Sequence, residues 1–413
     1  MYNLKGDFMK VLIIGGGPSG LMCALEAAKN NNQVFILEKN EKVGKKIYIT
    51  GKGRCNVTND CSVNDFINHV PTNARFLYSA LNDFAPKDTI SFFNEHGVPL
   101  VTERGNRVFP VSYKASDITR CLIKECEKYG VKIYCHSDIS SIEKKENKYI
   151  VKYNKMMQIE GDALVIATGG LSYPSTGSTG DGYKFASQFG HHIKPTTPSL
   201  VCIKVKDQVS YDAQGLTLKN VALHGYNDKF HHCIEGDLTF EKGAIDGPIV
   251  LKLSSLVVPC TDLKLYIDLK MALTFEELDA RIVKDIKNNQ TGRLKDEMEK
   301  LLPISMIKDF LTRVDLNPRI PLASLKKEDR LKIVTYLKKY SLDFISFGDY
   351  SRAIITRGGI DIKEINPKTM ESKLVKNLYF IGEVLDVDAF TGGFNMQIAF
   401  STGYACGKHL TEI

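Results

Sequence analysis

The chain has 413 residues, of which 43% are hydrophobic and 25% are charged, and its formal net charge is +7. This length allows about two or three domains, and the mild basic excess suits anionic ligands without requiring nucleic acid. The sequence predicts no signal peptide, and no run of about 18 apolar residues could span a membrane. Ten scattered cysteines without a C-x-x-C pair indicate reduced thiols of a cytoplasmic protein, and no ligand spacing predicts a bound metal.

Residues 10–38 have the pattern of a βαβ unit with a dinucleotide fingerprint. The apolar run at 11–14 is typical of a strand buried on both faces, and a second strand at 33–37 ends in Glu38. Between them, G-x-G-x-x-G opens a helix whose N-terminus offers N–H groups and partial positive charge to phosphates. The pattern predicts that Glu38 binds a ribose, that Gly15 makes the tight turn, that Gly17 lets the backbone approach a pyrophosphate, and that Gly20 lets helix and strand pack closely. Pro18 and Ser19, at the start of the helix, are also expected to bind the cofactor.

A glycine-containing, lysine-rich loop at 39–60 follows the second strand directly. It leaves the carboxyl end of that strand, where ligands bind in such units, and this position argues against a merely solvated surface loop. A guanidinium in this loop could donate in a fork to a pyrophosphate. We expect cofactor contacts from Lys39, Lys46, Gly53, Arg54, Cys55 and Asn56.

The segment 62–196 is predicted to be helical up to residue 130, except for a β-hairpin at 99–110 around Gly105-Asn106. Strands are expected at 131–135, 139–144, 149–153 and 163–166. The last of these leads into Ala167-Thr168-Gly169-Gly170, which allows the backbone to approach a ligand closely. The glycines at 177, 180 and 182 have the wrong spacing for a second dinucleotide site, so this loop is interpreted as a cover over the first ligand, opening a helix near Asp181.

The middle of the chain has a different pattern of hydrophobic and polar residues. Short alternating segments over 197–270, including 249–253, predict an antiparallel sheet or a small barrel. Helical patterns follow over 274–340, where basic residues outnumber acidic ones. This excess indicates a solvated lid or dimer contact, or alternatively a nucleic-acid patch. Strands return at 343–347, 353–355 and 378–381, and a final helix is expected over about 395–409.

Four features converge on FAD: the fingerprint with Glu38, the strand ending in Ala-Thr-Gly-Gly, the strand ending in Gly-Glu, and the final helix. FAD must be held along its whole length, whereas NAD requires only the first feature. In this interpretation the strand near Ile139 lies against adenine, and Glu383 binds near the ribityl–pyrophosphate stretch. The final helix points its positive end at the flavin pyrimidine edge. Further contacts are expected from Thr168, Gly169, Gly382, Asp386, Gly393, Asn395 and Met396.

Four stretches, at 44–59, 164–183, 356–360 and 378–403, closely resemble a bacterial family of FAD flavoproteins, known as the NAD(P)/FAD-dependent oxidoreductase or aminoacetone oxidase family. One branch is similar to a reductase of the Δ4 and Δ6 double bonds of 3-dehydro bile acids. Thr50-Gly51-Lys52-Gly53 departs from the S-G-G-G of many relatives. The resemblance implies an α/β fold with non-covalent FAD, made of a split Rossmann-type domain (1–196 and 351–413), a β-barrel-like domain (197–270 and 341–350) and a helical domain (271–340).

With a single fingerprint, NAD(P)H is expected only as a transient co-substrate at the flavin. We favour a reductase of an apolar small-molecule enone, with nucleic acid not expected as a partner and the oligomeric state left open. The turn Arg357-Gly358-Gly359 could polarise the enone carbonyl, and Tyr173 could protonate the α-carbon. Cys55 and Asp386 also lie in loops that should border the flavin. Two alternatives stay open: an oxygen-dependent oxidase of small amines such as aminoacetone, and a flavin-bearing RNA-binding protein.

Overall fold

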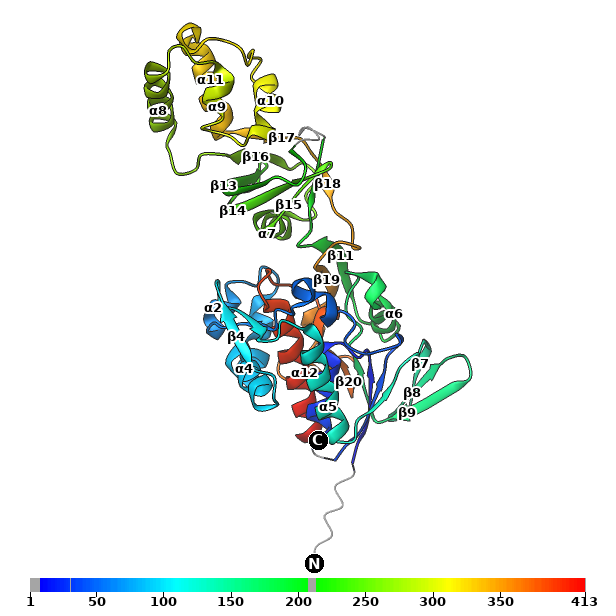
Figure 1. Cartoon of the computed structure of the whole chain (residues 1–413). Coiled ribbons are helices and arrows are strands. Elements are labelled where there is room, and N and C mark those ends of the chain that lie inside the picture. The colour runs from blue at the N-terminus through cyan, green and yellow to red at the C-terminus, as the bar shows by residue number, and fades with distance from the viewer. Residues whose placement is uncertain (1–7, 30, 207–212, 413) are drawn as a thin grey trace, which may run out of the picture. The chain divides into compact units, whose positions relative to one another are not determined.

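The computed structural model describes residues 8–29, 31–206 and 213–412 (Figure 1). The chain divides into two compact units. Unit 1 combines Met1–Pro198 with Ala353–Ile413, and unit 2 is Ser199–Arg352. Unit 1 is therefore built from both ends of the chain.

A five-stranded sheet with the order β20-β10-β1-β2-β6 forms the centre of unit 1. All its pairings are parallel, and the apolar runs of β1 and β10 are buried, as strands covered on both faces must be. The strands at 10–14, 33–37 and 163–166 confirm the predicted Rossmann-type arrangement. The bounds of the strands are β1 (Lys10–Ile14), β2 (Gln33–Leu37), β6 (Lys132–Tyr134), β10 (Ala163–Ile166) and β20 (Leu378–Phe380).

Helix α1 (Pro18–Ala28) packs directly against the C-terminal helix α12 (Phe394–Glu412). Two glycines of α12 allow this approach. A Cβ on Gly403 would overlap the carbonyl oxygen of Ser19, and one on Gly407 would lie 2.6 Å from the carbonyl oxygen of Cys23. The last helix is thereby fixed beside the first, although the whole chain separates them.

The other elements of unit 1 surround this core. The expected hairpin is present, since β4 pairs with β5 in the predicted place, whereas β9 was not predicted. The bounds are α2 (Val63–Ile67), α3 (Tyr78–Asp83), α4 (Pro86–Glu95), α5 (Ala115–Lys128), α6 (Asp181–Gln188), β3 (Thr58–Asn59), β4 (Leu100–Glu103), β5 (Arg107–Pro110), β7 (Ile139–Lys145), β8 (Lys148–Tyr153), β9 (Met157–Gly161), β11 (Ile193–Ser199) and β19 (Ile355–Ile360).

The segment Arg357-Gly358-Gly359 is not the turn that the sequence suggested. It lies inside β19, which pairs with β11. A Cβ on Gly358 would overlap the carbonyl oxygen of Pro195, so the glycine is required by the approach of the two strands. Glycine pairs are common in turns, but glycine also allows two strands to approach closely. The second role applies here, and the sequence alone does not distinguish the two.

Unit 2 contains a seven-stranded antiparallel sheet with the order β17-β16-β13-β14-β15-β12-β18 and four helices that follow β16. The sheet and helices share one hydrophobic core. The bounds are β12 (Ile203–Val205), β13 (Thr217–Tyr226), β14 (His231–Glu241), β15 (Ala244–Asp246), β16 (Lys264–Asp268), β17 (Tyr340–Leu342), β18 (Phe344–Phe347), α8 (Phe275–Asn288), α9 (Leu294–Met298), α10 (Ile304–Arg313) and α11 (Lys327–Lys338).

One predicted strand of unit 2 is wrong. Residues 249–253 lie in helix α7 (Pro248–Val257), which begins at a proline and packs against the sheet. Two sheet glycines leave room for it, because a Cβ on Gly236 would lie 2.7 Å from Ile249 and one on Gly225 2.9 Å from Leu253. From sequence, a short apolar run can be either a strand or a buried helix. Here it is a helix, which packs into the space left by the two glycines.

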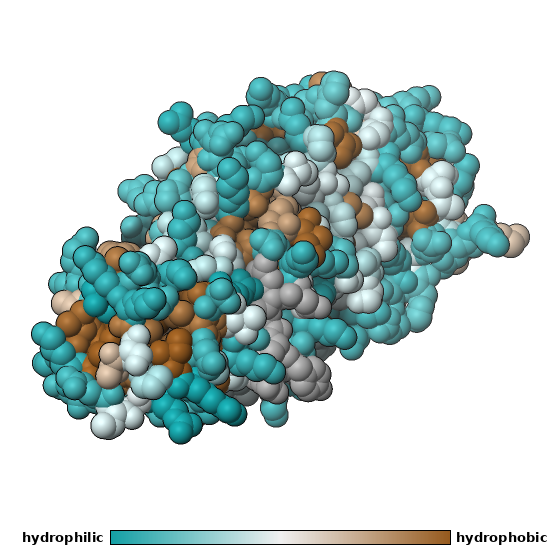
Figure 2. Space-filling view, turned by 90° about the horizontal axis from the view of Figure 1, so that it is seen from above, coloured by the Kyte–Doolittle hydropathy of each residue, from teal (hydrophilic) through white to brown (hydrophobic). Residues whose placement is uncertain are grey.

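No helix among the described residues is both long and apolar enough to cross a membrane. Figure 2 shows a face that is largely hydrophilic, with patches of hydrophobic residues between the polar ones.

The α1–α12 contact gives a first prediction. Replacing Gly403 by Ala should lower the free energy of unfolding by about 1–3 kcal/mol, because the overlap with Ser19 outweighs the roughly 1 kcal/mol that alanine gains in a helix. Thermal and urea unfolding of the FAD-free protein measure the change. Lys408→Ala, at an exposed position of the same helix, is the control and removes only a surface ion pair with Asp83, so it should cost less than about 1 kcal/mol. Equal stability of the two variants would contradict the close packing.

Candidate cofactor site

The three glycines of the fingerprint have different surroundings. A Cβ on Gly15 would overlap the carbonyl oxygen of Ala167, and one on Gly20 would overlap that of Gly15, so both are required by packing. Nothing lies within 4 Å of the position that a Cβ on Gly17 would take. Gly17 is the N-cap of α1 and Pro18 begins the helix, so this open space faces unpaired backbone N–H groups. Such a place fits a phosphate.

Glu38 directly follows β2, and it is buried. Its Oε2 accepts the Gly16 N–H at 2.8 Å, and its Oε1 accepts the backbone and side-chain N–H groups of Asn40 at 2.9 and 2.7 Å. These bonds fix the carboxylate beside the phosphate loop. Ionised oxygens accept more than one hydrogen bond, so ribose hydroxyls could still bind.

The loop after β2 contains two short 3-10 turns within Ile47–Gly53, separated by a kink at Thr50, Gly51 and Lys52. Lys52 in this segment has φ +57°, a left-handed conformation that glycine adopts without strain. This backbone conformation is a physical reason for the glycine that many relatives have at this position. Lysine tolerates the same conformation at some cost in free energy.

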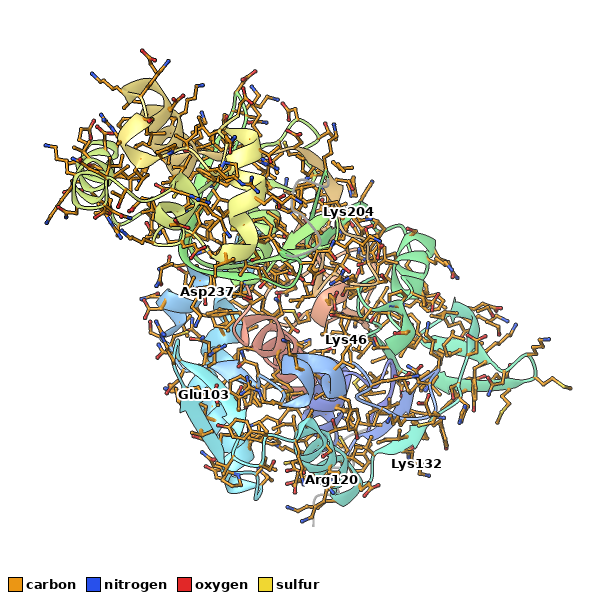
Figure 3. All side chains as sticks on the ribbon, turned by 45° about the horizontal axis from the view of Figure 1, so that its top comes forward. Lys46, Glu103, Arg120, Lys132, Lys204 and Asp237 are labelled. Atoms are coloured by element: carbon orange, nitrogen blue, oxygen red, sulfur yellow. The ribbon has the colours of Figure 1, made fainter. Side chains whose placement is uncertain are left out.

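Lys46, which is labelled in Figure 3, belongs to a network that joins four segments of unit 1. Its ammonium donates to Glu383 Oε2 at 2.5 Å and to Ser172 Oγ at 2.6 Å. Glu383 also accepts the Ser172 hydroxyl and, at 3.0 Å, the Thr356 N–H. The structure thus brings together two predicted residues, Lys46 and Glu383. Ser172 and Thr356 were missed, because a hydroxyl in a glycine-rich loop has no distinctive sequence signal.

Lys39, in contrast, is held away from this network. Its ammonium donates to Asp181 Oδ2 at 2.8 Å and to Thr179 Oγ1 at 2.5 Å, at the start of α6. The residue therefore ties the loop after β2 to the loop that was expected to cover the ligand.

Arg54, Cys55 and Asn56 have three different environments. The Arg54 guanidinium carbon lies 4.5 Å from the centroid of the Phe109 ring. Cys55 is fully buried, and burial raises the pKa of its thiol to about 12, so it remains protonated at neutral pH. Asn56 Oδ1 is buried without a hydrogen-bond partner in the described protein. An unpaired buried acceptor is costly and fits a donor from a bound ligand.

The ends of β10 and β20 approach the fingerprint closely. A Cβ on Gly382 would lie 2.6 Å from Ser19 Oγ, and the Gly382 N–H donates to Thr402 Oγ1 at 3.0 Å. Thr168 and Gly169 follow β10, where a Cβ on Gly169 would lie 2.8 Å from Ser178 Oγ. The predicted glycines therefore come together at the carboxyl edge of the sheet.

The start of α12 is organised by two amides. Asn395 accepts the Ala389 N–H at 2.9 Å and donates to the Ala389 carbonyl at 2.7 Å, so its side chain holds the preceding loop. Gln397, which was not predicted, accepts the hydroxyls of Thr58 and Thr89 at 2.6 and 2.8 Å. Gly393 packs on the backbone of Thr58, and Met396 packs against the core. The N-terminal N–H groups of the helix are thus held in place by buried bonds.

The catalytic candidates lie nearby in unit 1. Burial raises the pKa of Asp386, and the charge of Arg357 on β19 partly opposes this by lowering the pKa. The Asn73 amide donates to Asp386 Oδ2 at 2.9 Å. Tyr173 precedes a 3-10 turn beside Ser172. Ile139 begins β7 in a separate three-stranded sheet and packs against the core of unit 1. The assignment of each residue to FAD or to catalysis stays a prediction.

Residues 9–409 match the model of the HI0933-like protein Rossmann domain. The chain belongs to this family. It is 32% identical to the "Ribosomal RNA dihydrouridine synthase" of Haemophilus influenzae, over 98% of this chain and 99% of the relative. It is 29% identical to the "3-dehydro-bile acid delta(4,6)-reductase" of Clostridium scindens, over 98% and 99%. A flavocytochrome c3 fumarate reductase has a similar fold, with TM-score 0.53 and 14% identity, covering 98% of this chain and 78% of that structure.

The family assignment supports FAD and an oxidoreductase activity, as the sequence predicted. The residues fit this cofactor, because the open space at Gly17, the carboxylate of Glu38 that is predicted to bind a ribose and the unpaired Asn56 acceptor lie in one unit. Among the described residues, no group of three or more His, Cys, Asp or Glu side chains could hold a metal ion.

The phosphate space gives a second prediction. Replacing Gly17 by Ser should lower FAD affinity at least tenfold, or about 1.4 kcal/mol, because the new side chain takes the space of the pyrophosphate. Stability of the FAD-free protein should be retained, since serine is a good N-cap and no atom lies within 4 Å.

Flavin fluorescence titration and thermal unfolding separate the two effects. Gly20→Ala is the matched variant, and it should lose stability even without FAD. If Gly17→Ser binds FAD as the wild type does, the phosphates lie elsewhere.

Proposed function

We propose that this protein is an FAD-dependent reductase of a C=C bond conjugated to a carbonyl, and that its substrate is a uracil base in ribosomal RNA. The supporting observation is the full-length similarity to relatives named for two such reductions. In uracil the C5=C6 bond is conjugated to the C4 carbonyl, and in a 3-oxo-Δ4 steroid the C4=C5 bond is conjugated to the C3 carbonyl. Either reduction adds a hydride to the β-carbon and a proton to the α-carbon.

The enone expected from the sequence is thus kept, but we propose that RNA presents it instead of an apolar small molecule. The RNA-modifying relative supports this choice, which the mild charge of the chain alone did not favour. When bound, FAD supplies the hydride chemistry, and NAD(P)H is the reductant that we propose. The fingerprint glycines and the α1 N-terminus would hold the pyrophosphate, Glu38 the ribose, and the network of Lys46, Ser172 and Glu383 the ribityl region.

We propose that Arg357 polarises the reacting carbonyl and that Asp386 donates the proton to the α-carbon. A guanidinium stabilises the negative charge that develops on the carbonyl oxygen, which is worth roughly 3 kcal/mol in comparable sites. Asp386 is half-buried and interacts electrostatically with Arg357. Because burial raises its pKa, the carboxyl keeps its proton to higher pH than an exposed aspartate. Tyr173 is the alternative proton donor.

A bile-acid-type steroid is the second candidate substrate, since the clostridial relative is similar over nearly the whole chain. The third prediction separates the two. The FAD-loaded enzyme, incubated without oxygen with NADH or NADPH and with ribosomal RNA that lacks dihydrouridine, should convert uridine to dihydrouridine, detected by mass spectrometry of the digested RNA. A 3-oxo-Δ4 steroid acid should react much more slowly.

Faster reduction of the steroid would assign the enzyme to the second candidate. If neither substrate reoxidises the reduced enzyme, while air does so and aminoacetone is consumed, the protein is an amine oxidase and the proposal is wrong.

The fourth prediction concerns Asp386. In the wild type, reduction should slow as pH rises through the elevated pKa, because the acid loses its proton. Asp386→Asn should be about 10²–10⁴-fold slower, and this alkaline decline should disappear. Rates are measured over a pH series with FAD saturation verified by absorbance. Asp83→Asn, on the surface of the same unit, should keep the wild-type profile; an unchanged profile in Asp386→Asn would exclude its role as the acid.

A further inference from the structure

Unit 2 carries four neighbouring rings, one pair stacked and the others tilted or edge-on, that the proposed flavin chemistry does not use. His224 and Tyr226 lie on β13, His231 on β14 and Tyr266 on β16, and we call this group the ring plate. The rings of His224 and Tyr266 stack with centroids 4.2 Å apart and planes 8° apart. Tyr226 lies 5.9 Å from Tyr266 and 5.7 Å from His231, and His224 Nδ1 is 3.0 Å from His231 Nε2. The four rings therefore form one continuous group across three neighbouring strands.

The ring plate lies on the face of the sheet opposite α7. Leu223 and Gly225 alternate with plate residues along β13, and they face the buried side, where Leu253 of α7 meets Gly225. Successive strand residues point to opposite faces, so His224 and Tyr226 point away from α7. Neither Tyr226 nor Tyr266 packs against the hydrophobic core of unit 2, and His231 is exposed. Within unit 2, the ring plate is therefore not packed against the hydrophobic core.

Two lysines lie beside the plate, and on the same face the carboxylate of Glu235 acts electrostatically on Cys233, which stands opposite His224. The Lys339 ammonium lies 5.2 Å from the centroid of Tyr266 and 5.9 Å from that of Tyr226. Lys264 is exposed and stands opposite Tyr226 in the ladder. Neither lysine forms a salt bridge to another described residue, whereas the carboxylate of Asp268 is paired with Lys338 at 2.6 Å. The plate thus combines flat rings with two available cations.

We propose that the ring plate binds single-stranded RNA, with bases stacked on Tyr226 and Tyr266 and phosphates paired with Lys339 and Lys264. Aromatic rings that reach the surface of a sheet beside cations are a general solution for unstacked bases, and Tyr226 and Tyr266 are both partly exposed. An acidic protein would match the lysines but would not use the rings. His224, His231 and the neighbouring Cys233 do not make a metal site, since no set of described side chains could hold an ion.

This inference deepens the proposed function, because it names the surface that would retain an RNA substrate. It is tested on the full-length, FAD-loaded protein by fluorescence anisotropy with a labelled oligouridine of about 12 nucleotides. Tyr266→Ala should weaken binding about tenfold, or ~1.4 kcal/mol, by removing one stacking surface. Tyr266→Phe keeps the ring and should bind as the wild type does, which separates stacking from a folding defect.

The charge is tested separately by salt. Lys339→Gln should reduce the slope of log affinity against log salt by about 0.7, the value for one phosphate of a single strand. Tyr129→Ala is the matched control, since Tyr129 is an exposed ring in unit 1 with the Lys128 ammonium 5.5 Å from its centroid. It should change neither affinity nor slope.

Three outcomes would overturn the inference: no RNA binding by the wild type, equal binding by Tyr266→Ala and Tyr129→Ala, or equal competition by polyglutamate, which would assign the face to an acidic protein. The proposed function is tested separately from the ring plate. If RNA binds through the plate but uridine is not reduced, the plate is supported and the reductase assignment is wrong. If uridine is reduced equally by all variants, only the plate is wrong.

Discussion

The contact between α1 and α12 is the constraint on which unit 1 depends. The phosphate loop precedes α1, and the segment containing Gly382 and Glu383 precedes α12. These two regions can form one site only if their helices lie side by side. Gly403 and Gly407 make this possible, because any side chain there would meet the backbone of α1. The free energy that glycine loses in a helix interior is offset by burial along the whole helix pair.

Charge then joins the segments that the helices bring together. Lys46 and Glu383 are partly buried, and each would be costly alone in that environment. Paired with each other and with Ser172, they link the loop after β2, the loop after β10 and the end of β20. The buried amide of Gln397 does the same for the start of α12 by bonding two hydroxyls and a backbone carbonyl. These polar bonds hold in position the residues that are predicted to bind the cofactor.

Local pattern was sufficient for the parts of the fold that depend on near neighbours. The βαβ unit, the hairpin at 99–110 and helix α8 follow from hydrophobic period and turn residues. In the structure, a capping box of Thr274 and Glu277 also begins α8. The errors occurred where distant residues decide. The run at 249–253 is helical because Gly225 and Gly236 make space for it, and Gly358 extends a strand because Pro195 lies beside it. Ser172 and Gln397 were missed for the same reason, since their partners are far away in the sequence.

The pairing of β11 with β19 places the exit from unit 1 next to the point of return. All 154 residues from Ser199 to Arg352 leave and re-enter through these two neighbouring strands. Because the chain leaves and returns through neighbouring strands, the five-stranded sheet of unit 1 is complete without the insertion. Mutations can reshape the insertion while the sheet, the helix pair and the charge network of unit 1 remain unchanged.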